Sequence, residues 1–227
     1  MYIYLFKSAL ATTYMTFRDL YRTNQYFFIG FFLFAILSAF VLLGYSKADG
    51  FFLLNTFHAQ WLDYFFIVYT YAGDGYFCFG VGLLLFAFGK KPAGLMAIIS
   101  YAISGILSQL LKNVVIEARP ALYLAHSGYT HFIDDVTLHN NSSFPSGHTI
   151  SAFALAAVLS FDAKNKKYSV LFLALAALVG YSRIYLGQHF LDDVLSGALI
   201  GVLTSVLCWL FLMKLLTGWL AKKQNMH

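Results

Sequence analysis

The chain has 227 residues, of which 60% are hydrophobic and only 11% are charged, against roughly 25% charged in an ordinary globular chain. Its mean hydropathy is +0.70. A soluble domain of this length still exposes about a quarter or more of its unfolded surface, so it cannot bury this much apolar area. The composition excludes a soluble domain, a disordered chain and a collagen, and it predicts an all-α, polytopic membrane protein.

The formal charge of +5 and the isoelectric point near 9.1 do not indicate a nucleic-acid binder. The basic residues are scattered singly and in pairs and do not gather in one patch. We therefore expect no nucleic-acid partner, and we expect membrane lipids to surround the chain.

Six apolar stretches predict six transmembrane helices. In chain order they are Tyr26–Tyr45, Gly75–Gly89, Pro92–Leu111, Ser146–Phe161, Tyr168–Tyr181 and Val194–Leu212. The second would cover only ~22 Å of a ~30 Å hydrocarbon core, so it must borrow residues on one side. The fifth is also too short unless it continues past Arg183.

Trp61–Tyr71 predicts an interfacial helix, with a re-entrant segment as the alternative, because Asp63 and Asp74 flank it. The resulting division is an N-terminal arm over residues 1–25, a six-helix membrane domain over 26–215 and a tail over 216–227. The arm lacks a small-residue cleavage site, so no cleaved signal peptide is expected. Cys78 and Cys208 lie in apolar runs and are interpreted as packing residues.

The distribution of charge predicts the orientation of these helices. Eleven of the fifteen basic residues fall in the arm, the tail and two loops on one face, which is then cytoplasmic with both termini. Eight of the ten acids fall on the opposite face. Lys112, Arg119 and Arg183 break the rule at the ends of apolar stretches, where a cation is costly unless it has a functional role.

Three polar clusters meet at this outer face. They are Lys112 with Arg119-Pro120, then Pro145-Ser146-Gly147-His148, then Ser182-Arg183 with His189 and Asp193. Lysine and arginine suit a phosphate dianion, and a helix that starts at Ser146-Gly147 directs free backbone N–H groups at an anion. His189 and Asp193 stand four residues apart, so the carboxylate can fix the imidazole tautomer that leaves Nε2 nucleophilic.

In their order and spacing these clusters resemble the three-part signature of the type-2 phosphatidic acid phosphatase superfamily: Lys-x6-Arg-Pro, Pro-Ser-Gly-His and Ser-Arg-x5-His-x3-Asp. Every signature position is filled between Lys112 and Asp193. The resemblance implies an integral-membrane lipid phosphatase, in bacteria a phosphatidylglycerophosphatase, an undecaprenyl diphosphate phosphatase or a lipid A phosphatase.

The resemblance also implies the chemistry, which is phosphate-ester hydrolysis without a metal or other cofactor. His189 would attack phosphorus and become a phosphohistidine, Asp193 would orient it, and His148 would protonate the leaving oxygen and then activate water. The remaining signature residues would hold the phosphate oxygens: Lys112, Arg119, Ser146, Gly147 and Arg183, supported by Pro120, Pro145 and Ser182. His58, His126, His131 and His139 show no compact zinc spacing, so no metal site is expected.

The expected substrate is a lipid phosphate in the outer leaflet of a bacterial inner membrane. An isoprenoid or glycerolipid phosphate comes first, and the 1-phosphate of lipid A is the alternative. A phosphotransferase of the same family and a membrane anion transporter remain open. Paired broken helices typical of many transporters are not evident in the sequence. Residues 121–144 carry no usable signal, and the sequence does not define the oligomeric state.

Overall fold

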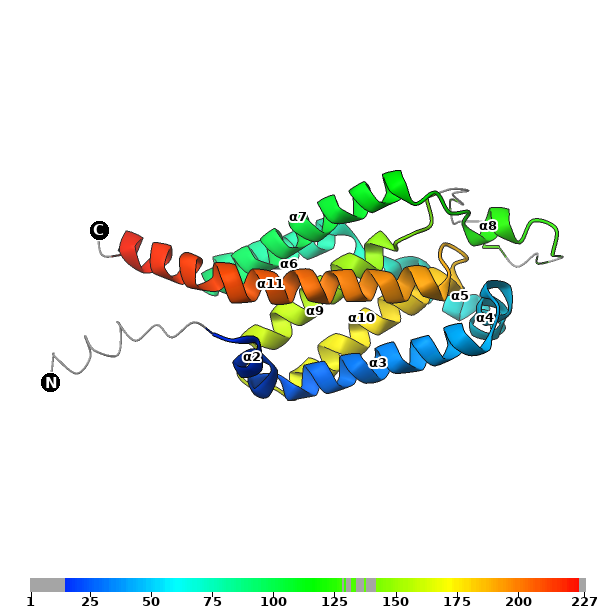
Figure 1. Ribbon diagram of the computed structural model, residues 1–227. Helices are drawn as coiled ribbons and strands as arrows, with labels where there is room; N and C mark the ends of the chain where they lie inside the picture. The colour runs from blue at the N-terminus through cyan, green and yellow to red at the C-terminus, as the bar shows by residue number, and fades with distance from the viewer. Residues whose placement is uncertain (1–14, 128, 130–131, 134–136, 138–141, 225–227) are drawn as a thin grey trace, which may run out of the picture.

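The computed structural model describes residues 15–127, 129, 132–133, 137 and 142–224, and all regular secondary structure within them is helical. The long helices form an elongated bundle with shorter helices at its ends (Figure 1). The helices are α2 (Phe17–Thr23), α3 (Gln25–Gly44), α4 (Lys47–Leu54), α5 (Gln60–Tyr69), η1 (Thr70–Gly73), α6 (Gly75–Ala87), α7 (Lys91–Val114), α8 (Pro120–Tyr123), α9 (Gly147–Asp162), α10 (Tyr168–Tyr185) and α11 (Leu191–Gln224).

Each of the six predicted apolar stretches is helical, but the lengths of the helices differ. Four are long and apolar enough to span a membrane: α3, α7, α10 and the first 23 residues of α11. As expected, α10 continues past Arg183. The short α6 pairs with α5–η1 across a 57° bend, and together they could form a fifth, broken span. The chain is therefore an integral membrane protein with four or five such candidates among its described residues, and six spans remain a prediction.

Helix α9, which has only 16 residues, lies at the centre of the bundle. It packs against α7, α10 and α11, and 12 of its 16 residues are buried. The sequence explains this position because α9 is rich in Ala, Ser and Thr, whose small side chains let neighbouring helices approach closely. A helix that is surrounded by protein can be shorter than a helix that spans the membrane in contact with lipid.

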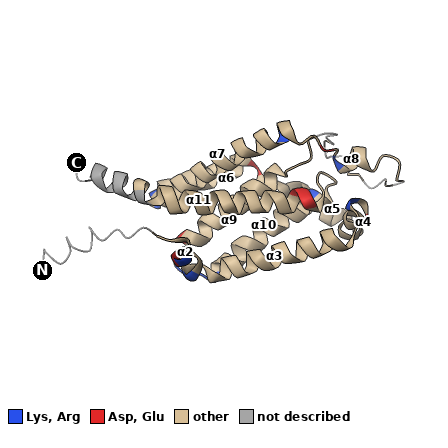
Figure 2. Cartoon of the chain, in the orientation of Figure 1, with Lys and Arg blue, Asp and Glu red and all other residues tan. Residues whose placement is uncertain are grey.

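Charged residues lie toward the two ends of this bundle, and the long middle portions carry almost none (Figure 2). Helix α2 and the C-terminal end of α11 lie at one end, and α4, α5 and α8 lie at the other (Figure 1). Near the second end, η1 packs against α5, α6, α9 and α10. The polar residues singled out in the sequence gather at this second end.

Candidate active site

A cavity of about 420 Å³ opens at this end of the bundle. It is lined by six of the predicted residues, drawn from all three sequence clusters: Lys112, Arg119, Gly147, His148, Arg183 and His189. Segments far apart in sequence therefore converge on one polar hollow. Ile67, Thr70, Tyr71, Asp74, Thr137, Leu186 and Gln188 complete its wall.

His189 is buried against the carboxylate of Asp193. The distance from its Nδ1 to Asp193 Oδ2 is 3.3 Å, and both side chains are almost fully buried. Because Nδ1 faces this carboxylate, we assign the proton to Nδ1, which leaves the Nε2 lone pair on the opposite side of the ring. Asp193 Oδ2 also accepts hydrogen bonds from the Ser143 hydroxyl at 2.5 Å and from the Phe190 amide at 2.9 Å. The carboxylate is thus held in place independently of the histidine.

The turn between α10 and α11 determines where His189 lies. Gly187 has φ +64°, a left-handed conformation that favours glycine and ends the helix. The Gln188 and His189 amides then donate to the Arg183 carbonyl, at 2.9 and 3.1 Å. The Asn55 side chain donates to the carbonyls of residues 184 and 185, at 2.6 and 3.0 Å. These bonds satisfy the last carbonyls of α10 and fix the turn.

Three cations line the cavity from three different segments. Lys112 Nζ donates to the Ser142 carbonyl at 2.6 Å, and Arg183 Nη1 donates to the Thr70 hydroxyl at 2.7 Å. Arg119 Nη1 donates to Gln188 Oε1 at 3.1 Å. Arg183 is only 8% exposed, and its Nε contacts no hydrogen-bond acceptor among the described residues. Neither Lys112 nor Arg183 pairs with a carboxylate in that part of the chain.

Helix α9 begins at the cavity wall. Its N-cap is Ser146, and no side chain caps the first turn. A Cβ added at Gly147 would meet no atom of the described residues within 4 Å, so the backbone there borders space that an anion could occupy. The Ser146 amide donates to the Asp193 carbonyl at 3.1 Å. This bond ties the helix start that carries His148 to the helix start that carries Asp193.

The other predicted residues lie behind this wall. Ser146 is fully buried, and its hydroxyl accepts a hydrogen bond from Thr149 at 2.8 Å, so it is not among the lining residues. Pro120 is buried at the start of α8, Pro145 follows a cis peptide bond after Phe144, and Ser182 donates to the Val179 carbonyl at 2.6 Å. The supporting role of Pro120, Pro145 and Ser182 stays a prediction.

The surroundings of His189 favour its neutral form. Burial, together with the positive charges of Arg183, Arg119 and Lys112, holds the pKa of His189 well below its usual value near 6.5. Burial also lowers the pKa of Arg119, although the Asp193 carboxylate opposes that effect. A neutral imidazole beside concentrated positive charge is suited to attack an anionic phosphorus centre.

Sequence reasoning missed several polar residues of this site. Ser143 directly precedes the Phe144-Pro145-Ser146-Gly147-His148 run, but a serine in a loop gives no specific signal. Thr70, Asp74 and Gln188 line the cavity. Thr70 contacts Arg183 across 113 positions of sequence, and only the tertiary structure shows that pair.

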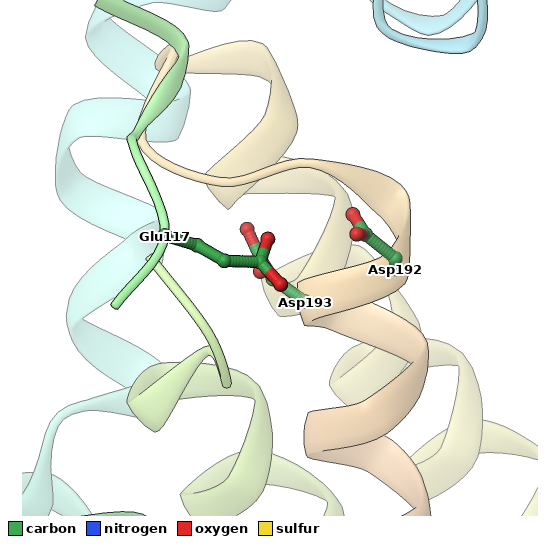
Figure 3. Close-up of side chains that lie close together, drawn as sticks. All are labelled: Glu117, Asp192 and Asp193. Atoms are coloured by element: carbon green, nitrogen blue, oxygen red, sulfur yellow. The ribbon is translucent and has the colours of Figure 1, made fainter. Parts of the chain in front are cut away.

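Three acids lie close together beside His189, and one lysine pairs with two of them. Glu117 comes from the segment between α7 and α8, and Asp192 and Asp193 come from the first turn of α11 (Figure 3). One carboxylate oxygen from each lies within 4.8 Å of the others. Lys47, at the start of α4, forms ion pairs with Glu117 and, at 2.8 Å, with Asp192. The cluster already contains a balancing cation, and we interpret it as an ion-pair network that links three elements.

The remaining histidines do not change this description. His58 Nε2 is 2.8 Å from the Asn55 carbonyl, at the C-terminal end of α4. His126 is exposed on the segment after α8. His131 and His139 lie outside the described residues.

The chain is similar to known proteins over much of its length. The family model of the PAP2 superfamily matches residues 93–216, more than half of the chain. Phosphatidylglycerophosphatase B of Bacillus subtilis is 32% identical over 133 residues, which cover 54% of this chain and 60% of that protein. The chain therefore spans less than two thirds of the length of this relative.

Two crystal structures resemble the fold. LpxE of Aquifex aeolicus is 34% identical with a TM-score of 0.60, over 70% of this chain and 92% of that one. A transmembrane PAP2-type phosphatidylglycerolphosphate phosphatase from B. subtilis is 26% identical with a TM-score of 0.57, over 87% and 97% of the two chains. The apolar helices and the second of these structures define an integral membrane protein. The chain belongs to the PAP2 superfamily.

Proposed function

We propose that the chain hydrolyses the terminal phosphate of a membrane lipid through a phosphohistidine on His189. The observation that carries this proposal is the convergence of three cations, His148 and a buried His189–Asp193 pair on one cavity. Arg183 is buried and Lys112 is partly buried, and neither has a carboxylate partner among the described residues, which is costly for a cation. A bound phosphate would supply the missing negative charge.

The reaction then proceeds in two displacements. His189 Nε2 forms a bond to phosphorus while the bond to the lipid oxygen breaks, and His148 gives that oxygen a proton. In the second step His148 takes a proton from water, and the water oxygen displaces His189 to release inorganic phosphate. Lys112, Arg119, Arg183 and the Gly147 amide stabilise the non-bridging oxygens, where charge stabilisation and positioning dominate phosphoryl transfer.

A glycerolipid phosphate is the preferred substrate in this proposal because two similar proteins carry that activity in their names. Isoprenoid diphosphates and the 1-phosphate of lipid A present the same terminal group. The charge distribution supports a site on the non-cytoplasmic face of a bacterial inner membrane, with both termini in the cytoplasm.

Phosphate release from a panel of lipid phosphates by the purified protein in detergent with EDTA tests the proposal. We expect release from at least one of them, led by phosphatidylglycerol phosphate. No release from any would contradict a phosphatase, and phosphoryl transfer to another lipid without release would identify a phosphotransferase. EDTA-sensitive activity restored by a divalent metal would contradict the mechanism.

A matched pair of lysine variants assigns the activity to the cavity. Lys112→Met removes a cavity cation and should abolish most of the release. Lys90→Met removes a lysine that pairs with Asp162 at 2.7 Å, at the opposite end of the bundle, and should retain it. Equal loss in both variants would contradict a specific role for the cavity lysine.

A further inference from the structure

A second cavity, of about 300 Å³, lies between α6, α9 and α10. Its wall is almost wholly apolar, and among the described residues that line it the one polar side chain, Tyr69, already donates to the Leu175 carbonyl at 3.0 Å. The buried residues Ala152 and Ala156 of α9 form its floor, and the exposed residues Phe77 of α6 and Leu175 of α10 lie at its rim. We call this second cavity the apolar groove.

The groove exists because of how the three helices pack. Both α6 and α10 contact α9, and small alanine side chains on α9 leave a hollow between them. The rim is formed by residues that are 48% and 44% exposed, Phe77 and Leu175. In an integral membrane protein, exposed apolar residues on the spanning helices face lipid. The groove therefore opens sideways toward the hydrocarbon of the bilayer.

The groove and the active-site cavity are lined by neighbouring turns of the same elements. On α9, His148 lines the active-site cavity, and Ala152, one turn later, lines the groove. On α10, Arg183 lines the active-site cavity, and Val179, one turn earlier, lines the groove. The turn η1 lies at the boundary: Thr70 and Tyr71 face the active site, and Ala72 lines the groove.

The boundary between the two cavities is closely packed at Gly73. A Cβ added at Gly73 would approach Val179 to 2.5 Å and the His148 carbonyl to 2.7 Å, so only glycine allows η1 to lie this close to both helices. The close approach places the end of the groove directly beside the residues that flank the active site. Because no space remains at Gly73, the apolar part of a molecule whose phosphate lies in the cavity would reach the groove along the lipid-facing side of this turn, where Tyr71 is 62% exposed.

We propose that the apolar groove holds a hydrocarbon chain of the lipid phosphate whose head group is hydrolysed. This proposal rests on the proposed function. When the hydrocarbon chain of the lipid moves from the bilayer into the groove, its surroundings stay apolar. The hydrophobic effect therefore contributes little to the free energy of binding. Its contribution is to orient the substrate so that phosphorus lies in line with His189. Filling the groove should therefore impair lipid substrates far more than substrates without a chain.

The experiment narrows the groove and compares two substrates. Ala156→Phe and Ala72→Leu add volume at the floor and at the η1 end, and Ala174→Phe adds the same volume on an exposed face of α10 as the control. For each, kcat/KM is measured with a long-chain lipid phosphate and with an aryl phosphate. In the groove variants the ratio of lipid to aryl kcat/KM should fall by about tenfold or more. In the control the ratio should remain as in the wild type.

A second measurement uses the wild-type protein and so does not depend on how the variants fold. A long-chain lipid phosphate with a photoreactive group in its chain is cross-linked, and the labelled residues are found by mass spectrometry. We expect label on α6, α9 and α10 at the groove, reduced by excess unlabelled substrate. Label confined to outer faces such as that of α3, or groove label that substrate does not displace, would overturn the proposal.

Failure of this proposal is distinguishable from failure of the proposed function. A wild-type protein that releases phosphate from neither substrate contradicts the proposed function. A wild-type protein that hydrolyses both, with an unchanged ratio in both groove variants, contradicts the groove alone.

Discussion

His189 and His148 line the same cavity but have different surroundings. Asp193 contacts the Nδ1 side of His189, whereas His148 begins α9 beside the open backbone at Gly147. The proposed mechanism gives the first histidine the role of nucleophile and the second the role of acid and then base. Substitution of each should therefore fail in a different way.

His189→Ala should form no phosphoenzyme from any substrate because the attacking nitrogen is absent. His148→Ala should still form one from an aryl phosphate, whose leaving group barely needs a proton. With a lipid alkyl phosphate, the His148 variant should be slower by ~10²- to 10⁴-fold, the usual contribution of a positioned acid. Single-turnover rates with the two substrates measure this difference. An equal loss of activity toward both substrates in both variants would contradict the division of roles between the two histidines.

The pH dependence follows from the lowered pKa of His189. Since the folded pKa lies below the unfolded value near 6.5, the neutral histidine contributes stability that is complete above that pH. The contribution is lost as the pH falls through the lower, folded pKa. Activity should likewise be retained above the folded pKa and fall below it. His189 therefore remains a competent nucleophile below pH 6.5.

The acid limb of kcat/KM tests this point with an aryl phosphate whose own ionisation is measured separately. After correction for the substrate, we expect no further loss of activity near pH 6.5. A second break at that pH would show that His189 titrates like an ordinary surface histidine.

At the scale of elements, Lys47 connects segments that carry different parts of the site. Its ion pairs hold the start of α4 against Glu117, two residues before Arg119, and against Asp192, next to Asp193. Its Nζ also lies 4.8 Å from the centre of the Phe190 ring. Burial alone lowers the pKa of Lys47, but hydrogen bonds to Asp192 and Glu117 outweigh that effect and raise it.

Lys47→Met should lower kcat by about tenfold to a hundredfold, since small displacements of reacting groups have effects of that size. KM should change less, and Lys47→Arg should restore much of the rate because it keeps the charge. The stability loss should stay near 1 kcal/mol, because the pairs are partly exposed and screened by solvent. Kinetics and thermal unfolding of both variants measure these effects. An unchanged kcat in the methionine variant would contradict a positioning role.

The sequence predicted the helices and six of the lining residues because both depend on local patterns. Apolar runs determine helices, and fixed spacings brought Lys112, Arg119, His148 and His189 to helix ends at one face. Ser143 and Thr70 could not be predicted because their partners lie 50 and 113 positions away. The bend between η1 and α6 was also missed, since it depends on packing against α9 and α10.

At the scale of the whole molecule, the account requires the cavity to face away from the cytoplasm. The exposed residues Ser127 and Asn165 lie in segments expected on opposite sides of the membrane. The native cysteines, Cys78 and Cys208, are buried, so background labelling should be low. With an impermeant thiol reagent on intact cells, Ser127→Cys should be labelled and Asn165→Cys should not. The reverse pattern would contradict the proposed orientation.

The most direct test of the central claim is to locate the phosphoryl group during turnover. The protein reacts with a lipid phosphate in EDTA, the reaction is quenched at alkaline pH to preserve phosphohistidine, and the modified residue is mapped by mass spectrometry. The account predicts acid-labile phosphate on His189, with accumulation in His148→Ala when an aryl phosphate is the donor. Phosphate on another residue, or turnover with no phosphoenzyme in either protein, would contradict it.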